Sequence, residues 1–262
     1  MKTYTGAKVN LSLAVTGKCR GLHTLDMRVC TVSLCDSAEL AEGEGRRFVW
    51  KKTREGFDPE RFEPVLERAY ARLAEHFGGA PRFVLEKDIP SGAGLGGSSA
   101  LIACMARLWA MASGREPDDG LLLSLGSDVP YMYRGGEARV TGRGEKVEGL
   151  PFVPREVLIA LPHCGVDTAA AYALYDGMKE AGELPERRGE HFNDLFAPAV
   201  RLAPEVGRAA DALRAAGARD VVMTGSGSAV CAFFDSAEEL ARVRARAEGE
   251  FDCIPAHTLP GN

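Results

Sequence analysis

The chain has 262 residues, of which 45% are hydrophobic and 26% are charged, and its formal net charge is −5. This length allows one large domain or two lobes around a substantial core, and the composition is ordinary for a globular protein. Basic residues never occur in runs longer than two, and no apolar run approaches the roughly 18 residues of a membrane span. The N-terminus also lacks the apolar core of a signal peptide. We therefore expect neither nucleic acid nor a membrane among its partners.

Seven cysteines are spread along the chain without a C-x-x-C motif or zinc-like pairs. Several of them stand inside apolar runs, and their odd number does not suit a disulfide framework. We expect reduced, mostly buried thiols in a cytoplasmic protein.

The first predicted element is a strand over residues 7–15. Its apolar side chains alternate along one face, which is typical of a half-buried strand: Val9, Leu11, Leu13 and Val15. Lys8 and Asn10 share the other face, and spacing alone directs both to solvent. A turn and a second strand over residues 27–34 follow. Between them lies His23, and a single histidine is more often structural than catalytic.

Residues 42–58 are charged and contain glycine, so we predict an exposed loop or a short hairpin. A helix should follow, with Pro59 in its first turn and Asp58 as its cap. Apolar residues then recur at helical spacing: Phe62, Val65, Leu66, Ala69, Tyr70, Leu73 and Phe77. A short strand over residues 82–87 leads into the next stretch.

That stretch places four glycines within six positions, followed by two serines and an apolar run that reaches Gly114. Glycine permits positive φ angles and lets a ligand approach the backbone closely. A helix N-terminus offers unpaired N–H donors and a partial positive charge, which suit a phosphate. We predict a glycine-rich loop that leads into a helix. Ser98 or Ser99 would cap this helix, and either could reach a phosphate or its Mg²⁺.

Three interpretations of this stretch compete. A plain loop before a buried helix rarely needs four glycines. The dinucleotide-binding pattern G-x-G-x-x-G fits residues 92–97 literally, but that match is weak by itself. Pro90 and the charged residues 86–88 also stand where a buried parallel strand should enter. The third interpretation is a triphosphate cradle outside the P-loop class, because the chain contains no G-x-x-x-x-G-K-[ST].

Further features lie near the middle of the chain. A short helix is expected from Asp118 to Leu125, and Asp128 follows it in Gly-Ser-Asp-Val-Pro. On the residues alone, Asp128 suits a helix cap or an Asx-turn as well as it suits a catalytic carboxylate. Residues 135–146 follow, and Lys146 at their end could meet a substrate phosphate or simply face solvent.

The remaining elements predict a second lobe. We place the boundary near residues 151–154, which gives lobes of residues 1–152 and 153–262. The expected elements are a strand over 157–162, a helix from Asp167 or Thr168, a helix start at Asn193-Asp194, a helix over 206–216, a hairpin over 221–234, a helix over 237–247 and a strand over 251–254.

Several motifs together resemble those of the GHMP kinases, a family that includes galactokinase, homoserine kinase and mevalonate kinase. Pro-x-x-x-Gly-Leu-Gly-Gly-Ser-Ser-Ala at residues 90–100 resembles the family's phosphate-binding motif. Gly-Ser-Asp-Val-Pro at 126–130 resembles its second signature, and the glycine turn at 225–228 resembles its third. The resemblance implies an α+β fold of two lobes, with the active site in the cleft between them.

The resemblance also implies roles for particular residues. Asp128 would be the catalytic carboxylate, and Lys8 would face the reacting hydroxyl beside it. ATP and Mg²⁺ would be the cofactors, with Ser98 or Ser99 near the metal. The phosphates of ATP would be held by Pro90, Gly92, Gly94, Leu95, Gly96, Gly97, Ser98 and Ser99.

Ala-Lys-Val-Asn-Leu at residues 7–11 and Gly-Leu-His-Thr at 21–24 resemble one branch of this family, and residues 135–146 resemble a strand and turn of the same branch. That branch phosphorylates a cytidine diphosphate-linked alcohol in the non-mevalonate route to isoprenoid precursors. The implied substrate-binding residues are Asn10, Leu22, His23, Lys146, Tyr172, Gly225, Ser226 and Gly227. Leu22 stands where the branch usually has a tyrosine against the cytosine, which forfeits stacking worth about 1–3 kcal/mol per base in nucleic-acid complexes. Tyr172 could supply that aromatic contact instead.

Two alternatives stay open. The protein could phosphorylate another small alcohol, of the homoserine or mevalonate type, or it could bind a nucleotide or metabolite without turnover. Retention of Lys8, Asp128 and both serines argues against the second alternative. Residues 57–62 lack the Asn-Leu pair that family members place near the adenine. The sequence therefore assigns no residues to the adenine pocket. The oligomeric state is likewise unknown.

Overall fold

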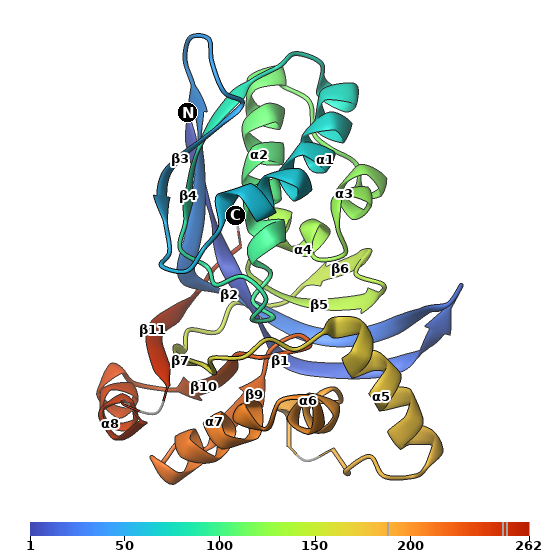
Figure 1. Ribbon diagram of the computed structural model, residues 1–262, viewed down its shortest axis with the longest axis vertical. Helices are drawn as coiled ribbons and strands as arrows, with labels where there is room; N and C mark the ends of the chain where they lie inside the picture. The colour runs from blue at the N-terminus through green and yellow to red at the C-terminus, as the bar shows by residue number, and fades with distance from the viewer. Residues whose placement is uncertain (188, 248, 250, 262) are drawn as a thin grey trace.

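A long antiparallel hairpin, formed by β1 (Lys2–Cys19) and β2 (Leu22–Ala41), connects the two halves of the molecule. Figure 1 shows it in blue, passing from the half that carries α1 to α4 towards the half that carries α5 to α8. Both strands are much longer than the sequence pattern predicts. Irregularities in their register, such as the one between Asn10 and Ser12, allow so long a hairpin to bend. The computed structural model describes residues 1–187, 189–247, 249 and 251–261.

The other strands join this hairpin in one extended sheet, in the order β3-β4-β2-β11-β7-β10-β9. Beside this path, β8 pairs with β1, and β5 pairs with both β2 and β6. The bounds of these strands are Phe48–Thr53 (β3), Arg82–Lys87 (β4), Glu137–Gly142 (β5), Lys146–Gly149 (β6), Glu156–Leu161 (β7), Phe192–Asn193 (β8), Asp220–Met223 (β9), Val230–Phe234 (β10) and Asp252–Leu259 (β11).

The described helices fall into two groups (Figure 1). In the first half they are α1 (Pro59–Phe77), α2 (Gly97–Ser113), α3 (Asp119–Leu125) and α4 (Val129–Arg134). In the second half they are α5 (Thr168–Glu180), α6 (Phe196–Leu202), α7 (Pro204–Ala215) and α8 (Ala237–Ala247). The α+β fold expected from the motifs is confirmed.

Local sequence signals account for much of the first half. Asp58 caps α1 as predicted, because its carboxylate accepts hydrogen bonds from the N–H groups of Glu60 and Arg61 at 3.0 and 3.4 Å. The buried face of α1 packs with α2 and β4 around Tyr70 and Trp109, whose ring centroids are 4.9 Å apart. The prediction for residues 42–58 needs a correction. The strand β3, which begins within this stretch, runs parallel to β4 and is therefore no hairpin arm.

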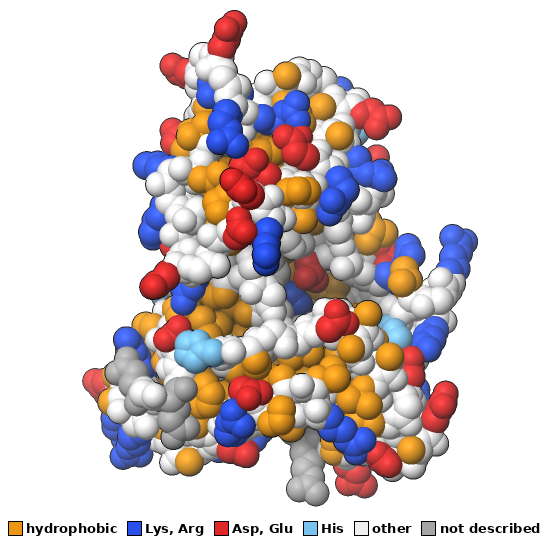
Figure 2. Space-filling model, in the orientation of Figure 1, with side chains coloured by type: hydrophobic (Ala, Val, Ile, Leu, Met, Phe, Trp, Pro, Cys, Tyr) orange, Lys and Arg blue, Asp and Glu red, His pale blue; other side chains and the backbone are white. Residues whose placement is uncertain are grey.

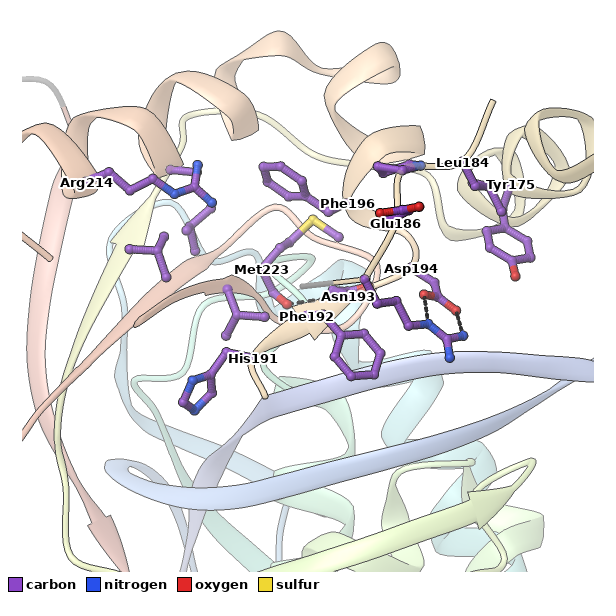
Figure 3. A pocket seen from close by; sticks show the side chains of 16 residues that line it. Tyr175, Leu184, Glu186, His191, Phe192, Asn193, Asp194, Phe196, Arg214 and Met223 are labelled. Atoms are coloured by element: carbon purple, nitrogen blue, oxygen red, sulfur yellow. Dashed lines mark hydrogen bonds and ion pairs between the residues drawn. The ribbon is translucent and has the colours of Figure 1, made fainter. Parts of the chain in front are cut away.

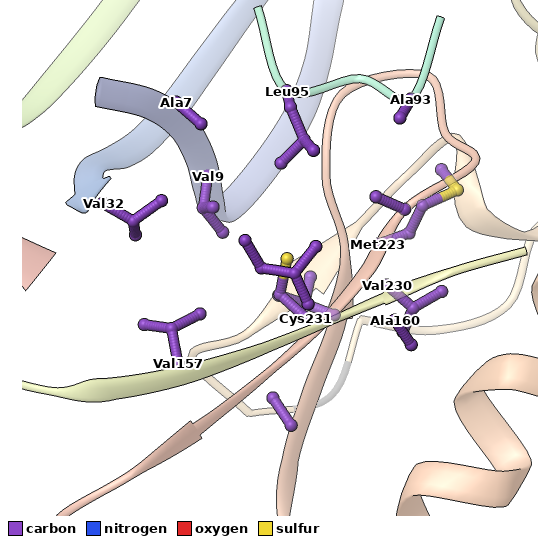
Figure 4. Close-up of a cluster of buried hydrophobic side chains, with 14 of the residues drawn as sticks. Ala7, Val9, Val32, Ala93, Leu95, Val157, Ala160, Met223, Val230 and Cys231 are labelled. Carbon is purple, nitrogen blue, oxygen red and sulfur yellow. The ribbon is translucent and has the colours of Figure 1, made fainter. Parts of the chain in front are cut away.

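A second apolar cluster lies directly beneath the glycine-rich stretch. Figure 4 shows Leu95 and Ala93 of that stretch near side chains of β1, β2, β7, β9 and β10, among them Val9, Val32 and Val157. Leu95 is 1% exposed, so it anchors the stretch in the core. A loop with such an anchor can hold its backbone groups in fixed positions.

The halves are also joined through β11, which pairs with β7 along most of its length and with β2 at Thr258 and Leu259. The division of the chain at residue 152 stays a prediction. No helix among the described residues is both long enough and apolar enough to span a bilayer.

Candidate active site

A cleft of about 460 Å³ lies where the two halves meet, and Figure 2 shows the molecule hollowed at this level. Its wall combines segments that are far apart in the sequence. They include Lys8, Asp128 and Tyr172, together with most of the glycine-rich stretch and the turn at 225–227. The structure therefore brings the three motifs of the sequence to one place.

The glycine-rich stretch ends at the N-terminus of α2. Gly92, Gly94 and Gly96 all have positive φ angles, between 72° and 75°, which glycine adopts without strain. Gly96 is the N-cap of α2, and the structure records no side-chain cap hydrogen bond for it among the described residues. The predicted serine cap is therefore wrong. The first intrahelical bond runs from Ala100 N to Gly96 O, so the N–H groups before Ala100 have no intrahelical acceptor and can hold an anion.

The two serines differ in position. Ser98 is exposed on the cleft wall, whereas Ser99 is buried and lies beside Gly126. A Cβ built on Gly126 would stand 3.7 Å from Ser99 Oγ. Ser98 is therefore the serine whose hydroxyl faces the cleft.

The glycine-rich stretch packs directly on the turn at 225–227. A Cβ built on Gly94 would lie 2.2 Å from the carbonyl oxygen of Thr224, and one built on Gly225 would lie 2.9 Å from the carbonyl oxygen of Gly94. The backbone N–H of Ala229 also donates to the carbonyl of Ala93 at 3.1 Å. Glycine is thus required on both sides of this contact.

We expect Gly94→Ala to weaken ATP binding and turnover strongly, because the new methyl group would push the two turns apart. Gly92→Ala is the matched control, since Gly92 also has a positive φ but its Cβ would meet none of the described residues within 4 Å. Both variants carry the backbone strain, of about 1–3 kcal/mol, and only Gly94→Ala adds the clash. Calorimetric ATP affinity and thermal unfolding would separate the two effects. Equal losses of affinity in both variants would contradict this explanation.

Lys8 and Asn10 lie beneath the glycine-rich stretch, although their spacing on β1 directs them to solvent. Lys8 is 5% exposed and Asn10 is fully buried. The glycine-rich stretch lies against this part of β1, since the N–H of Lys8 donates to the carbonyl of Leu95 at 3.1 Å and a Cβ built on Gly96 would stand 3.0 Å from Lys8 Cγ. Lys8 Nζ then lies 2.9 Å from Asn10 Oδ1 and 3.8 Å from Asp128 Oδ1.

Asp128 occupies the N-cap position of α4, yet within the described part of the chain its side chain makes no cap hydrogen bond. Pro130 stands at the second helical position and has no N–H to offer. The carboxylate is about one-third exposed and faces the cleft. The cap function considered for Asp128 is thus not used, and its oxygens are free for a ligand.

The Asn10 amide has a fixed orientation. Its Oδ1 accepts from Lys8 Nζ and from the N–H of Gly225 at 3.0 Å, and both of those groups can only donate. Its Nδ2 is buried and has no hydrogen-bond partner among the described residues. Asn10 therefore links the position of Lys8 to that of the turn at 225–227.

An aromatic pair forms another part of the site. The rings of His23 and Tyr172 are stacked with centroids 4.4 Å apart, and Tyr172 lines the cleft. His23 Nε2 lies 2.9 Å from Asp176 Oδ1, and Lys18 donates to the other oxygen at 2.7 Å. The Lys18 hydrogen bond lowers the pKa of Asp176, and burial raises the pKa of Tyr172 to about 12. Leu22 is 54% exposed at the hairpin tip, outside the cleft wall.

The structure adds cleft residues that the sequence did not single out. Arg143 lines the cleft from the turn between β5 and β6, whereas the predicted Lys146 is exposed on β6. Phe62 of α1 also lines the cleft, and it contacts an aromatic cluster with Trp50 and Phe57. The glycine-rich turn around Arg143 was visible in the sequence, but its pattern could not show which cation points inwards.

The model of the GHMP kinases N terminal domain matches residues 64–136, and that of the GHMP kinases C terminal domain matches residues 171–252. The chain belongs to the GHMP kinases. It is an ATP-dependent small-molecule kinase, as the motifs implied.

Relatives with a named function show which branch of the family this chain is similar to in sequence and fold. The 4-diphosphocytidyl-2-C-methyl-D-erythritol kinase of Paracoccus denitrificans is 35% identical over 257 residues, which cover 93% of this chain and 90% of that protein. The enzyme of the same name from Bacillus pumilus is 31% identical over 276 residues, which cover 97% and 95%. A crystal structure of 4-(cytidine 5'-diphospho)-2C-methyl-D-erythritol kinase matches all of both chains with a TM-score of 0.79 and 28% identity. The mevalonate kinase of L. major, at 12% identity and a TM-score of 0.73, shares the fold.

Proposed function

We propose that the protein transfers the γ-phosphoryl group of ATP to the 2-hydroxyl of 4-diphosphocytidyl-2-C-methyl-D-erythritol. This reaction belongs to the non-mevalonate route to isoprenoid precursors. The observation that carries the proposal is the pairing of Lys8 with the partly exposed carboxylate of Asp128, 3.8 Å apart, beside a glycine-rich helix N-terminus. The relatives described above supply the choice of substrate.

The glycine-rich stretch binds the phosphates. The unpaired N–H groups at the start of α2 and its dipole favour negative charge at this position. Gly96 must lack a side chain, because a Cβ there would stand 2.8 Å from Met132 Sδ and 3.0 Å from Lys8 Cγ. The glycine-rich stretch thus fits a polyphosphate, and Phe62 offers an apolar surface to the adenine base of ATP.

Ser98 is the side chain on the cleft wall that would hold Mg²⁺. Among the described residues, no three His, Cys, Asp or Glu side chains gather as metal ligands. Phosphate oxygens and water would complete the coordination, as is usual for Mg²⁺ in phosphoryl transfer. Bound Mg²⁺ neutralises phosphate charge.

Asp128 accepts the proton of the substrate hydroxyl. Lys8 stabilises the negative charge that develops on the hydroxyl oxygen, and Asn10 holds the ammonium group in place. Little covalent chemistry is needed beyond this, so positioning and charge stabilisation supply most of the rate.

The cytidine end of the substrate lies at the aromatic pair. Tyr172 contributes the ring surface that Leu22 does not provide, and His23 stands beside it with its Nε2 bonded to Asp176. Gly225, Ser226 and Gly227 line the same cleft, and Ser226 Oγ lies 2.8 Å from Thr168 Oγ1 of α5, the helix that carries Tyr172.

A second candidate function is phosphorylation of another small alcohol. The exposure of Leu22 favours it, because this side chain is 54% exposed at the hairpin tip and lies outside the cleft wall. The fold is equally compatible, since a homoserine kinase matches 99% of the chain with a TM-score of 0.66 and 17% identity.

ATP consumption with three acceptor alcohols tests both candidates. We expect turnover with 4-diphosphocytidyl-2-C-methyl-D-erythritol and almost none with homoserine or mevalonate, because neither small alcohol carries a base that could stack on Tyr172. Turnover with one of the small alcohols alone would overturn the substrate and keep the kinase chemistry. ATP binding without consumption in any of the three assays would favour a non-catalytic member of the family.

A further inference from the structure

The short strand β8 crosses beneath the turn at 225–227. It pairs in parallel with β1 at Ser12 and Leu13, and the N–H of Asp194 donates to the carbonyl of Leu13 at 3.0 Å. The sequence suggested that Asn193-Asp194 begins a helix, and this interpretation is wrong. Helix α6 begins at Phe196 with Leu195 as its N-cap. The Asn193 side chain is therefore available for another function.

The Asn193 amide links the turn after β9 to the start of α6, because its nitrogen bonds to the turn and its oxygen to its own segment. Nδ2 donates to the carbonyl oxygens of Met223 at 2.7 Å and of Gly225 at 2.8 Å. Oδ1 accepts from the N–H of Leu195 at 2.9 Å. Figure 3 shows Asn193 beside Met223, with the dashed line between them. Since the carbonyls accept and the N–H donates, only one orientation of the amide satisfies these bonds.

Gly225 is consequently held from both sides. Asn10 accepts from its N–H and Asn193 donates to its carbonyl, so the peptide units on either side of Gly225 are fixed. The position matters because Gly225 touches Gly94 of the phosphate-binding stretch. Asn10 and Asn193 come from strands that are neighbours in the sheet, which gives the turn a rigid support.

A pocket of about 300 Å³ lies beside Asn193, lined among others by Met223, Phe192 and Phe196 (Figure 3). An open pocket provides no close-packed side chains to oppose a displacement of Asn193 or Met223. Ser226 Oγ, 2.8 Å from Thr168 Oγ1, ties a side chain of the turn to α5, whereas the two hydrogen bonds from Asn193 hold the backbone from the side of β8.

We propose that Asn193 is a positioning residue for phosphoryl transfer, which holds the turn at 225–227 against the phosphate-binding stretch. The inference rests on the proposed function, because the turn is taken to face the reacting groups. Asn193 acts through the backbone of Gly225 and lies outside the cleft wall.

Kinetics of Asn193→Ala test the proposal. We expect kcat to fall by about 100-fold at saturating ATP, because displacements of about 1 Å at a reacting centre cost that much. Arg187→Ala is the matched control. It removes the two hydrogen bonds that Arg187 donates to Asp194, at 2.8 and 2.6 Å, on the residue next to Asn193. That variant should lose stability and keep kcat within about threefold of the original. Equal losses of kcat in the two variants would overturn the proposal.

Asn193→Asp adds a readout that a merely structural role would not change. An ionised carboxylate has no proton for the carbonyls of Met223 and Gly225, whereas a protonated one can donate to either. The ratio of its kcat/KM to that of the original protein should therefore rise as the pH falls from 8 to 6. A ratio that is independent of pH would contradict the proposal.

Hydrogen exchange without substrate separates this inference from the proposed function. The N–H groups of Gly225 and Gly227 are bonded within the network, to Asn10 Oδ1 and to the carbonyl of Thr224. Asn193→Ala should speed their exchange about tenfold, and Arg187→Ala should not. If the original protein failed to phosphorylate the proposed substrate, this measurement would still decide the role of Asn193. Unchanged exchange in Asn193→Ala would refute that role.

Discussion

Asp128→Asn should lower kcat by about 10²- to 10⁴-fold while the fold and the ATP affinity stay intact. The amide that replaces the carboxylate cannot accept the proton of the substrate hydroxyl. Stability should change little, because the Asp128 carboxylate makes no cap hydrogen bond among the described residues. Steady-state kinetics, ATP calorimetry and thermal unfolding would together check this result.

Asp118 provides a matched control, because it also occupies an N-cap position and does use its side chain. Its carboxylate accepts from the N–H of Leu121 at 2.7 Å. Asp118→Ala should therefore destabilise the protein by about 0.5–2 kcal/mol and leave kcat unchanged. Asp128→Ala should instead lower kcat strongly and change the stability little. A kcat of Asp128→Asn within tenfold of the original would refute the base assignment and leave Asp128 as a group that orients the alcohol.

Lys87→Met should cost about 3–5 kcal/mol of unfolding free energy, the largest stability effect that we expect. Lys87 and Asp36 form an ion pair at 2.7 Å in which both side chains are completely buried. The second oxygen of Asp36 accepts from the N–H groups of Asp88 and Ile89, each at 2.8 Å, and Lys87 also donates to the carbonyl of Ile89. Removing the cation leaves a buried carboxylate uncompensated at the start of the phosphate-binding stretch.

Two comparisons make this prediction specific. Lys2→Met breaks a partly exposed pair with Glu86, at 2.9 Å, and should cost at most about 1 kcal/mol. The double variant Lys87→Met, Asp36→Leu should recover part of the loss, because no buried charge is left unpaired. Urea unfolding of the four proteins would measure these differences. A loss in Lys87→Met no larger than that in Lys2→Met would contradict the account of the buried pair.

Periodicity and caps predicted the local structure well. Residues 82–87 and 237–247 form the expected strand and helix, and Asp58 and Asp118 cap the expected helices. The family and the fold also followed from the sequence, because the GHMP motifs place chemically distinctive residues at fixed spacings. The comparisons confirm both.

What the sequence could not predict depends on contacts between distant segments. Alternation along β1 directs Lys8 to solvent, but the glycine-rich stretch, which follows far along the chain, lies against its side chain at Gly96. Lys87 ends the strand predicted over residues 82–87, and only its pairing with Asp36 on β2 explains the burial of its charge. The choice between Arg143 and Lys146 likewise depends on how the β5–β6 turn is directed towards the cleft. Spacing along one segment carries no information about such neighbours.

The pairing of β11 with β2 also has a consequence for how the protein forms during synthesis. Thr258 and Leu259 pair with Val32 and Thr31, so contacts of very long sequence separation complete the middle of the sheet. Until β11 leaves the ribosome, that part of β2 lacks its partner and presents an open strand edge, which is prone to association with other chains. Such non-local contacts also slow folding. A nascent chain that already contains every catalytic motif therefore still depends on its C-terminal strand for protection from aggregation.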